Sequence, residues 1–346
     1  MSTTRLQEVL ICFGRKKQAD ISTASAAADM WRFTKLNASL MNPKLATESD
    51  ADEYGKGHEF ATATYKTAWD VGTTLEKYLG AEIGSWAVCF ALGKVVKSGA
   101  GPYTYTCTPL IPSAGDAAEL PYLSYVEQIR PGGGVVVDRQ AVGVAVESFQ
   151  ITVGSGPGRA NSKLSVELVG SGKVIDTATG ITMPAATAEK LLPSASLTLT
   201  INGVDYVTNK NIVSLETGWK NNIRMDSGFF PGSGFQTPGD GSTGAIRGRL
   251  EFGNRVGNLK FVARFQNGSD EYTKLKAQTT GTAVVHLQFD ASNTLDLTWQ
   301  QITYSVVEIQ ETDQILTVAV ECIPMYHTTN GILTAVGKCV TSDICQ

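Results

Sequence analysis

The sequence contains few of the residues on which catalysis and metal binding most often depend. Its 346 residues include three histidines and six cysteines, and the cysteines form no CxxC pair. It has no G-x-S-x-G elbow and no H-E-x-x-H motif, which are two hydrolase signatures. His286 falls on the polar phase of a strand between Val285 and Leu287, where a surface residue is the ordinary interpretation. We therefore predict that the protein is not an enzyme and uses no metal or cofactor.

Long hydrophobic runs and strong charge are also absent. No apolar run approaches the ~18 residues that a membrane-spanning helix needs. Residues 1–17 lack the cationic region and apolar core of a secretory signal. The formal net charge is −4 without a basic cluster, which argues against a stable nucleic-acid binder but allows transient contact with DNA. Disulfides are not expected in a cytosolic chain, and Cys339 and Cys345 are the pair to test.

The most abundant residue types favour short strands joined by turns. The sequence has 35 glycines, many Thr, Ser and Val residues, and 42% hydrophobic residues, a mixture typical of β proteins. We expect a single domain over residues 1–346, with Asn202-Gly203 as a two-residue hairpin turn. The predicted strands are 31–37, 58–71, 103–108, 122–129, 142–153, 163–169, 196–201, 244–252, 259–265, 282–289, 294–307 and 315–324.

One long helix is predicted, over residues 73–92. Thr73-x-x-Glu76 matches a capping box, and apolar residues then recur on one face. Gly80 and Gly84 indicate either close packing against a sheet or a helix in two pieces, because each costs about 1 kcal/mol relative to Ala. Gly93 is expected to end the helix. A shorter helix is predicted over residues 186–191.

The loop over residues 38–57 is the most unusual segment, since loops between hairpin strands mostly have about two to five residues. It carries the acidic residues Glu48, Asp50, Asp52 and Glu53. A calcium loop starting at Asp50 would need a bidentate Glu at position 61, which is Ala61. The loop also lacks the large apolar residues that would form a core. A solvated arm of an assembling subunit is the better interpretation.

Two other patterns suggest ligand sites but have simpler explanations. Residues 170–173 (GSGK) follow a strand, but Val174 stands where a phosphate loop needs Ser or Thr, so we predict a turn. Trp219-Lys220 interleaves an aromatic with a basic residue, as single-strand binders do. Alternation along a strand is the better explanation of that pair, because the sequence has no basic cluster.

Several stretches in the same order resemble the tail tube (major tail) proteins of long-tailed bacteriophages. The resemblance covers residues of about 31–153 and 195–325. It rests on EYGKGHE at 53–59, on 72–93 ending in SWAVCFALG, on GPYTYTCTP at 101–109, on VESFQITV at 146–153, and on the WKNNI…GRLEFG region at 219–253. It implies a mainly β fold, a β-barrel or sandwich core flanked by one helix. Residues 154–195 would be an outer insertion and 327–346 a C-terminal tail.

The resemblance also implies a function and partners. Six copies would form a ring, and rings would stack into a tube that conducts double-stranded DNA into the host. The subunit would be assembled in the host cytoplasm, reside in the virion tail, and contact itself and other tail proteins (tape measure, terminator and distal tail). Residues 38–57 would reach the adjacent ring and 229–243 would be a second contact loop, so deleting 39–52 should leave a folded subunit that does not polymerise. The implied contact residues are Glu48, Asp50, Asp52, Glu53, Tyr54, Phe229, Phe230 and Phe235.

Three alternatives stay open at this point. Another tail component of the same fold, such as a terminator, minor tail protein or baseplate ring, would differ in copy number within the particle. A β-sandwich binding module would need a row of exposed aromatics on one sheet. A hydrolase that uses the acidic loop lacks any partnering motif.

Overall fold

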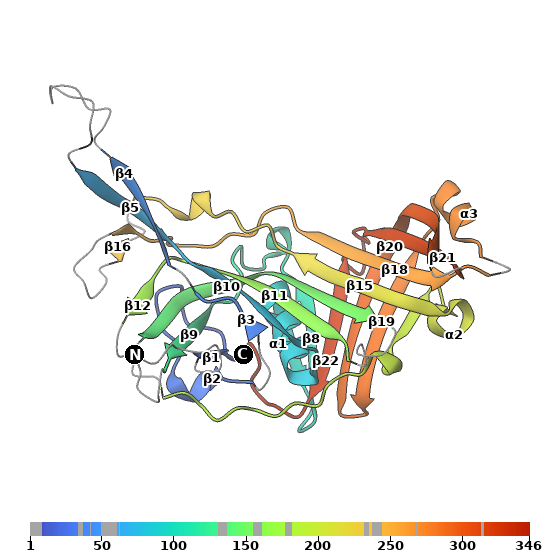
Figure 1. Ribbon diagram of the computed structural model, residues 1–346, viewed down its shortest axis with the longest axis horizontal. Helices are drawn as coiled ribbons and strands as arrows, with labels where there is room; N and C mark the ends of the chain where they lie inside the picture. The colour runs from blue at the N-terminus through green and yellow to red at the C-terminus, as the bar shows by residue number, and fades with distance from the viewer. Residues whose placement is uncertain are drawn as a thin grey trace.

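The computed structural model describes residues 9–33, 37–41, 43–49, 61, 63–130, 137–154, 161–176, 182–231, 235–236, 244–266, 269–312 and 315–346. Strands account for 56% of the residues and helices for 12%, so the protein is mainly β, as its composition predicts. Most strands belong to one large antiparallel sheet, accompanied in the described ranges by three α-helices (Figure 1). The strand pairings in these ranges branch but do not close into a ring. The predicted β-barrel is therefore not shown.

The main branch of the sheet contains eight antiparallel strands in the order β3, β6, β11, β10, β15, β18, β21 and β20. In that order they cover Asn37–Ala38, Gly72–Tyr78, Lys163–Gly170, Val137–Gly154, Ile212–Lys220, Val256–Arg264, Ile315–Pro324 and Asn293–Thr312. Leu75, Val166, Phe149 and Trp219 lie opposite one another on four neighbouring strands and are buried. Successive side chains of a strand face opposite ways, so one face of this branch forms the core and the other is polar.

The strands β10 and β20 are long because each belongs to two branches. Bulges interrupt β10 between Ala141 and Val144, and β20 between Tyr304 and Val306. A bulge bends its strand, which lets both strands leave the main branch. Gly143 lies at the first bend with φ 67°, and a Cβ there would be 2.2 Å from the carbonyl oxygen of Ile21. Only glycine fits that position.

Two smaller branches complete the large sheet. The N-terminal branch has the order β2, β1, β9, β10 and β12, and the C-terminal branch has β14, β13, β19, β20, β22, β8 and β7. The new strands are β1 Val9–Gly14, β2 Met30–Trp31, β7 Gly93–Ser98, β8 Tyr103–Pro109, β9 Leu123–Ile129, β12 Val174–Asp176, β13 Thr198–Ile201, β14 Val204–Asp205, β19 Thr280–Asp290 and β22 Leu333–Cys339. A separate sheet has the order β16 (Phe235–Gln236), β17 (Gly244–Ala245), β5 (Thr64–Asp70) and β4 (Lys44–Ser49).

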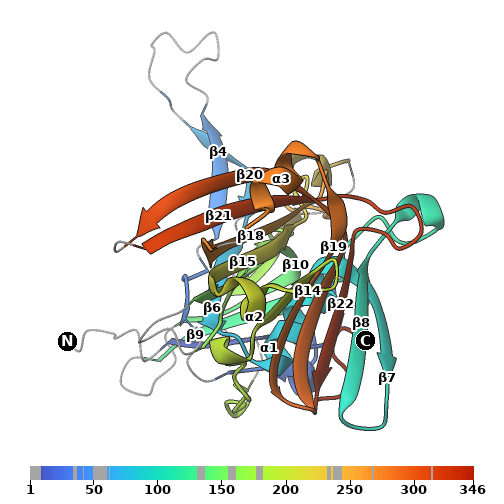
Figure 2. The ribbon, with the colours of Figure 1, turned by 90° about the vertical axis from the view of Figure 1, so that its right-hand side faces the viewer.

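The helix α1 (Ala81–Leu92) lies in the interior of the body (Figures 1 and 2). All of its residues are buried, including Glu82 and Ser85, whereas the sequence pattern predicts a single apolar face. It packs on β22, β10 and β8. A Cβ at Gly84 would lie 3.0 Å from Leu79 Cδ1, and one at Gly337 of β22 would lie 2.1 Å from Ser85 Oγ. The prediction that glycine allows close packing here is confirmed for Gly84, and Gly93 ends the helix with φ 88°.

The predicted start of this helix is wrong. The helix begins at Ala81, and the residues before it form β6. Within β6, Thr73, Leu75 and Lys77 face inward while Glu76 is exposed, so the residues that match a capping box alternate as in a strand. Pairing with β11 along the whole of β6 outweighs the local helix signal.

Three buried charged groups meet at the start of α1. Lys77 forms an ion pair with Glu189, and both side chains are almost fully buried. Glu189 also accepts a hydrogen bond from the backbone N–H of Ile83 at 2.7 Å, which satisfies one of the free donors of the first helical turn. Burial, with a smaller contribution from the nearby Glu189 carboxylate, raises the pKa of Glu82 to about 7 against the opposing effect of Lys77. Glu82 is therefore poised to titrate near neutral pH.

Other predictions for the chain have mixed outcomes. β21 has the predicted bounds, and Asn202-Gly203 joins β13 to β14 with Ile201 opposite Val204. Residues 186–191 are extended instead of helical, because the Thr187 N–H donates to the Arg32 carbonyl and the Lys190 carbonyl accepts from Ala81 at the start of α1. Of the predicted strand 244–252, only Gly244 and Ala245 are a strand.

Two segments predicted to lie outside the core contribute inner strands. The segment 154–195 includes β11, which pairs with β6 and β10, and the segment 327–346 includes β22, which pairs with β20 and β8. The alternation of Leu164, Val166 and Leu168 predicts β11 as a strand but not its inner position, whereas small and polar residues masked the strand signal of β22. In β22, alternate residues are buried, and these are Leu333, Ala335, Gly337 and Cys339. Gly337 has no side chain because a Cβ there would collide with Ser85 of α1.

Candidate assembly interface

The hairpin of β4 and β5 projects from the body, as both views show (Figures 1 and 2). Its register runs from Lys44 opposite Asp70 to Ser49 opposite Thr64. Residues Lys44–Ser49 of the predicted polar loop 38–57 therefore form a strand, because β5 pairs with them. Nearly all residues of the two strands are exposed or half-buried. Within the described residues, only the base of the hairpin pairs further, where Ala68 of β5 lies opposite Ala245 of β17. Because a two-stranded hairpin is at best marginally stable in water, the outer part of the arm is expected to contact a partner.

Arg247 fixes the base of this arm. Its side chain is 5% exposed, and its Nη1 lies 3.1 Å from Asp70 Oδ1 at the end of β5. The same guanidinium donates to the carbonyl oxygens of Met225 (2.7 Å) and Gly170 (3.3 Å), and it lies 4.5 Å from the ring centroid of Phe229. Charge-assisted hydrogen bonds and a cation–π contact together hold the loop before β16 against the main branch. The body thus presents the arm in a fixed direction.

The residues expected from the sequence to make contacts are only partly brought together. Phe229 and Phe230 lie beside the base of the arm, under the guanidinium groups of Arg247 and Arg249. Glu48 is exposed on β4, opposite the exposed Tyr65. Phe235 belongs to β16. Asp50, Asp52, Glu53 and Tyr54 lie outside the described residues.

The expected deletion of residues 39–52 would remove more than the arm. Met41 is 1% exposed within the core, and its backbone N–H donates to Glu127 at 2.7 Å. Ser39 N–H donates to the Thr74 carbonyl, which extends the pairing of β3 with β6. A cleaner excision keeps Leu45 and Trp69, which pair at the base of the hairpin.

A second exposed feature, not anticipated from the sequence, lies where β20 and β21 extend beyond the core. In the described part of the chain, the second half of β20 pairs only with β21, so its other edge is open to a further strand, although the short helix α3 (Glu271–Lys276) also contacts β20. Ile309 is 59% exposed, Leu316 49% and Phe265 41%. Ile309 lies opposite Val318, and Phe265 N–H donates to the Leu316 carbonyl at 2.9 Å, so the three side chains share one face. We call Phe265, Ile309 and Leu316 the edge patch.

The face of the main branch opposite the core is polar. It is hollowed beside β6, β10 and β11, where a cavity of about 540 Å³ is lined by Glu76, Lys163, Gln150 and other polar residues. Charges of both signs occur along this face, and Lys260 pairs with Glu321 at 2.8 Å on neighbouring strands. Among the residues that the structure describes, this face therefore shows mixed charges and no basic stripe of the kind that holds nucleic acid tightly.

The described ranges offer few candidates for a metal-binding or catalytic site. They contain no cluster of three or more His, Cys, Asp or Glu residues that could hold a metal ion. His286 contacts Asp296 across the β19–β20 pair. Lys173, in the predicted turn, donates to the Ser22 carbonyl at 2.8 Å. No helix in this part of the chain is long and apolar enough to cross a membrane.

No protein-family model matches the chain, and no curated protein sequence matches it either.

Proposed function

We propose that the protein is the structural subunit of a bacteriophage tail tube, which forms stacked hexameric rings around a channel for DNA. The observation that carries this proposal is the main branch of the sheet, which ends at an open edge of β20 beside the exposed edge patch. The ordered sequence similarities to tail tube proteins favour the same function. A mainly β fold with a projecting hairpin is compatible with it.

Exposed sheet edges recruit other strands, and proteins either cover them or use them. The two ends of the main branch differ: β20 ends one side and the short β3 ends the other. Joining one end to the other end of the next copy is a head-to-tail contact, which closes into a ring when the rotation allows. Burial of Phe265, Ile309 and Leu316 in the same contact would add hydrophobic stabilisation.

The arm and the polar face complete the proposed tube. The β4–β5 hairpin reaches the adjacent ring, and other tail proteins cap the ends of the stack. The polar face of the main branch lines the channel. Its mixture of charges suits passage of DNA, because each additional unpaired lysine would add a salt-dependent attraction to phosphate.

The edge patch provides the test. In the variant Ile309→Lys, a charge replaces an apolar side chain next to the open edge, so we expect a folded subunit that no longer forms rings. Ile323→Lys is the matched control, because Ile323 has similar exposure on the same hairpin but lies on β21, which is paired on both sides. Sedimentation velocity would measure assembly and circular dichroism would confirm folding. Equal assembly of Ile309→Lys and wild type would contradict the proposal, as would equal loss in both variants.

The arm is tested separately by replacing residues 46–68 with Asn-Gly, a two-residue turn that joins Leu45 to Trp69. We expect this variant to form single rings that do not stack. Long tubes from it, seen by electron microscopy, would refute the role of the arm while leaving the ring contact intact.

A further inference from the structure

The interior contains a group of cysteines that the proposed assembly does not use. Cys89 on α1 and Cys107 on β8 are both 0% exposed. Their Sγ atoms lie 2.7 Å apart, and both residues are free cysteines in this structure. The pair singled out by sequence, Cys339 and Cys345, is arranged differently, because Cys339 Sγ contacts the Thr341 carbonyl at 3.7 Å. The fold thus brings together two thiols that lie 18 residues apart in the chain.

We propose that Cys89 and Cys107 are a site of reversible covalent modification, where a disulfide joins α1 to β8 when the protein meets a low-molecular-weight disulfide such as oxidised glutathione. A separation of 2.7 Å is well inside the contact distance of two non-bonded sulfur atoms. The bond itself is ~2.05 Å long. Since α1 packs directly on β8, small side-chain rotations bring the two atoms to that length.

The reaction is two successive thiol–disulfide exchanges. One cysteine thiolate attacks the oxidised glutathione disulfide, which gives a mixed disulfide and releases one glutathione thiolate. The second cysteine thiolate then attacks the protein sulfur of that mixed disulfide and releases a second glutathione thiolate. The two protein thiols lose two protons and two electrons in total, the electrons reduce one glutathione disulfide to two thiols, and the protons pass to the solvent and the leaving thiolates.

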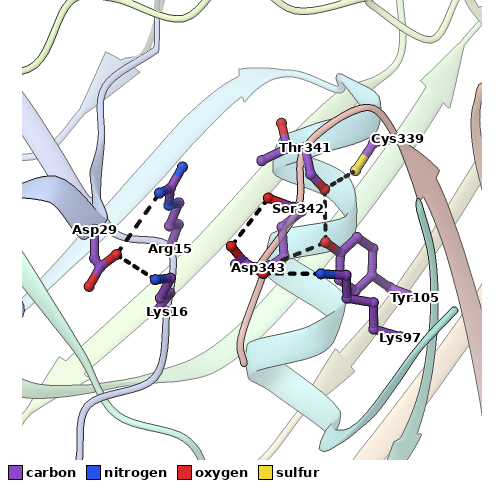
Figure 3. A network of polar contacts seen from close by, with 10 residues as sticks. Arg15, Lys16, Asp29, Lys97, Tyr105, Cys339, Thr341, Ser342 and Asp343 are labelled. Carbon is purple, nitrogen blue, oxygen red and sulfur yellow. Dashed lines mark hydrogen bonds and ion pairs between the residues drawn. The ribbon is translucent and has the colours of Figure 1, made fainter. Parts of the chain in front are cut away.

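The disulfide between Cys89 and Cys107 forms only when glutathione can reach the buried thiols. Burial raises the pKa of the Cys89 thiol well above its ordinary value, so the reactive thiolate is scarce while α1 is packed. Oxidation therefore proceeds during folding or when the C-terminal segment opens. That segment is held beside β8 by Tyr105, which donates to the Thr341 carbonyl at 2.8 Å, and by the ion pair of Lys97 with Asp343 at 3.0 Å (Figure 3).

A third buried thiol, that of Cys345, is an alternative partner for Cys107, so the identity of the bonded pair can be tested. The Cys107 thiol is among the groups that raise the pKa of Cys345, so Cys345 lies near enough to compete. The geometry nevertheless favours Cys89, whose sulfur is already in contact with that of Cys107.

Peptide mapping can identify the bond. The full-length protein would be refolded with oxidised glutathione, alkylated under denaturing conditions and digested with trypsin without reduction. Lys94 and Lys97 lie between the two cysteines, and trypsin does not cleave between Arg130 and Pro131, so the predicted product is a peptide of residues 78–94 linked to one of residues 98–139. Dithiothreitol should separate the two peptides, and the intact protein should be lighter than its reduced form by two hydrogen atoms.

Other products would overturn the proposal. These are complete alkylation of all six cysteines, a link between residues 98–139 and 339–346, or a bond confined to residues 339–346. The variant Cys89→Ala should lose the 78–94 link, whereas Cys322→Ala, which removes a buried cysteine from β21, should keep it. Loss of the link in Cys322→Ala would also contradict the assignment. The wild-type map decides the question even where a variant fails to fold.

Discussion

Replacing Glu82 with Gln should stabilise the protein at alkaline pH and have little effect at acidic pH. Glu82 is 4% exposed at the start of α1, and one of its carboxylate oxygens has no hydrogen-bond partner in the described ranges. Burial raises the pKa of this carboxyl to about 7 from 4.5. Glutamine has nearly the same shape and stays neutral at every pH, so it imitates the protonated acid.

The direction in which stability changes with pH follows from proton linkage. Between pH 4.5 and about 7 the folded protein keeps the Glu82 proton while the unfolded chain releases it, so stability falls as pH rises through this interval. One pKa unit corresponds to about 1.36 kcal/mol, which gives an upper value of about 3 kcal/mol for the loss. Partial solvent screening reduces this to on the order of 2 kcal/mol. Glu82→Gln removes that loss at pH 8.

Urea unfolding followed by tryptophan fluorescence at pH 4.5, 6 and 8 measures the effect, because Trp86 lies on the same helix. The difference in unfolding free energy between Glu82→Gln and wild type should grow from near zero at pH 4.5 to about 2 kcal/mol at pH 8. Glu167→Gln, on an exposed position of β11, is the control and should show no such trend. A difference independent of pH, or a less stable variant at pH 8, would refute the reasoning.

Two further substitutions test the interior. Lys77→Met leaves the Glu189 carboxylate buried without its partner and should cost about 3–5 kcal/mol at neutral pH. Because burial raises the pKa of Glu189, this cost should shrink in acid, where urea titrations can follow it. Asn221→Ala removes amide hydrogen bonds to the Ala91 and Val146 carbonyls and the acceptor of the Trp219 indole, so it should cost about 3 kcal/mol in thermal or urea unfolding. A loss below about 1 kcal/mol would contradict that role.

The sequence predicts strands best where their alternation coincides with burial. β21 has the predicted bounds because Val318, Val320 and Cys322 face the core at every second position. Prediction from the sequence fails where long-range strand pairing overrides a local signal. Thr73 and Glu76 resemble a helix start, yet β11 pairs with them along a strand.

The candidate interface is less accessible to sequence reasoning, for a physical reason. Ile309 and Leu316 have the apolar, alternating character of core residues, and only the extent of the core beneath them determines that they are exposed. The base of the arm likewise depends on Arg247, which meets Asp70 across 177 positions of the chain. The unusual length of the segment 38–57 did indicate an arm, but not that part of it pairs as a hairpin.

Negative-stain electron microscopy of the purified wild-type protein tests the central claim most directly. The open edge of β20, the edge patch and the projecting arm favour rings that stack into hollow tubes as concentration rises, and the resemblance to tail tube proteins implies six subunits in each ring. Rings that never stack would favour a different tail component of the same fold. A protein that stays monomeric at high concentration, with its edge patch exposed to solvent, would contradict the account.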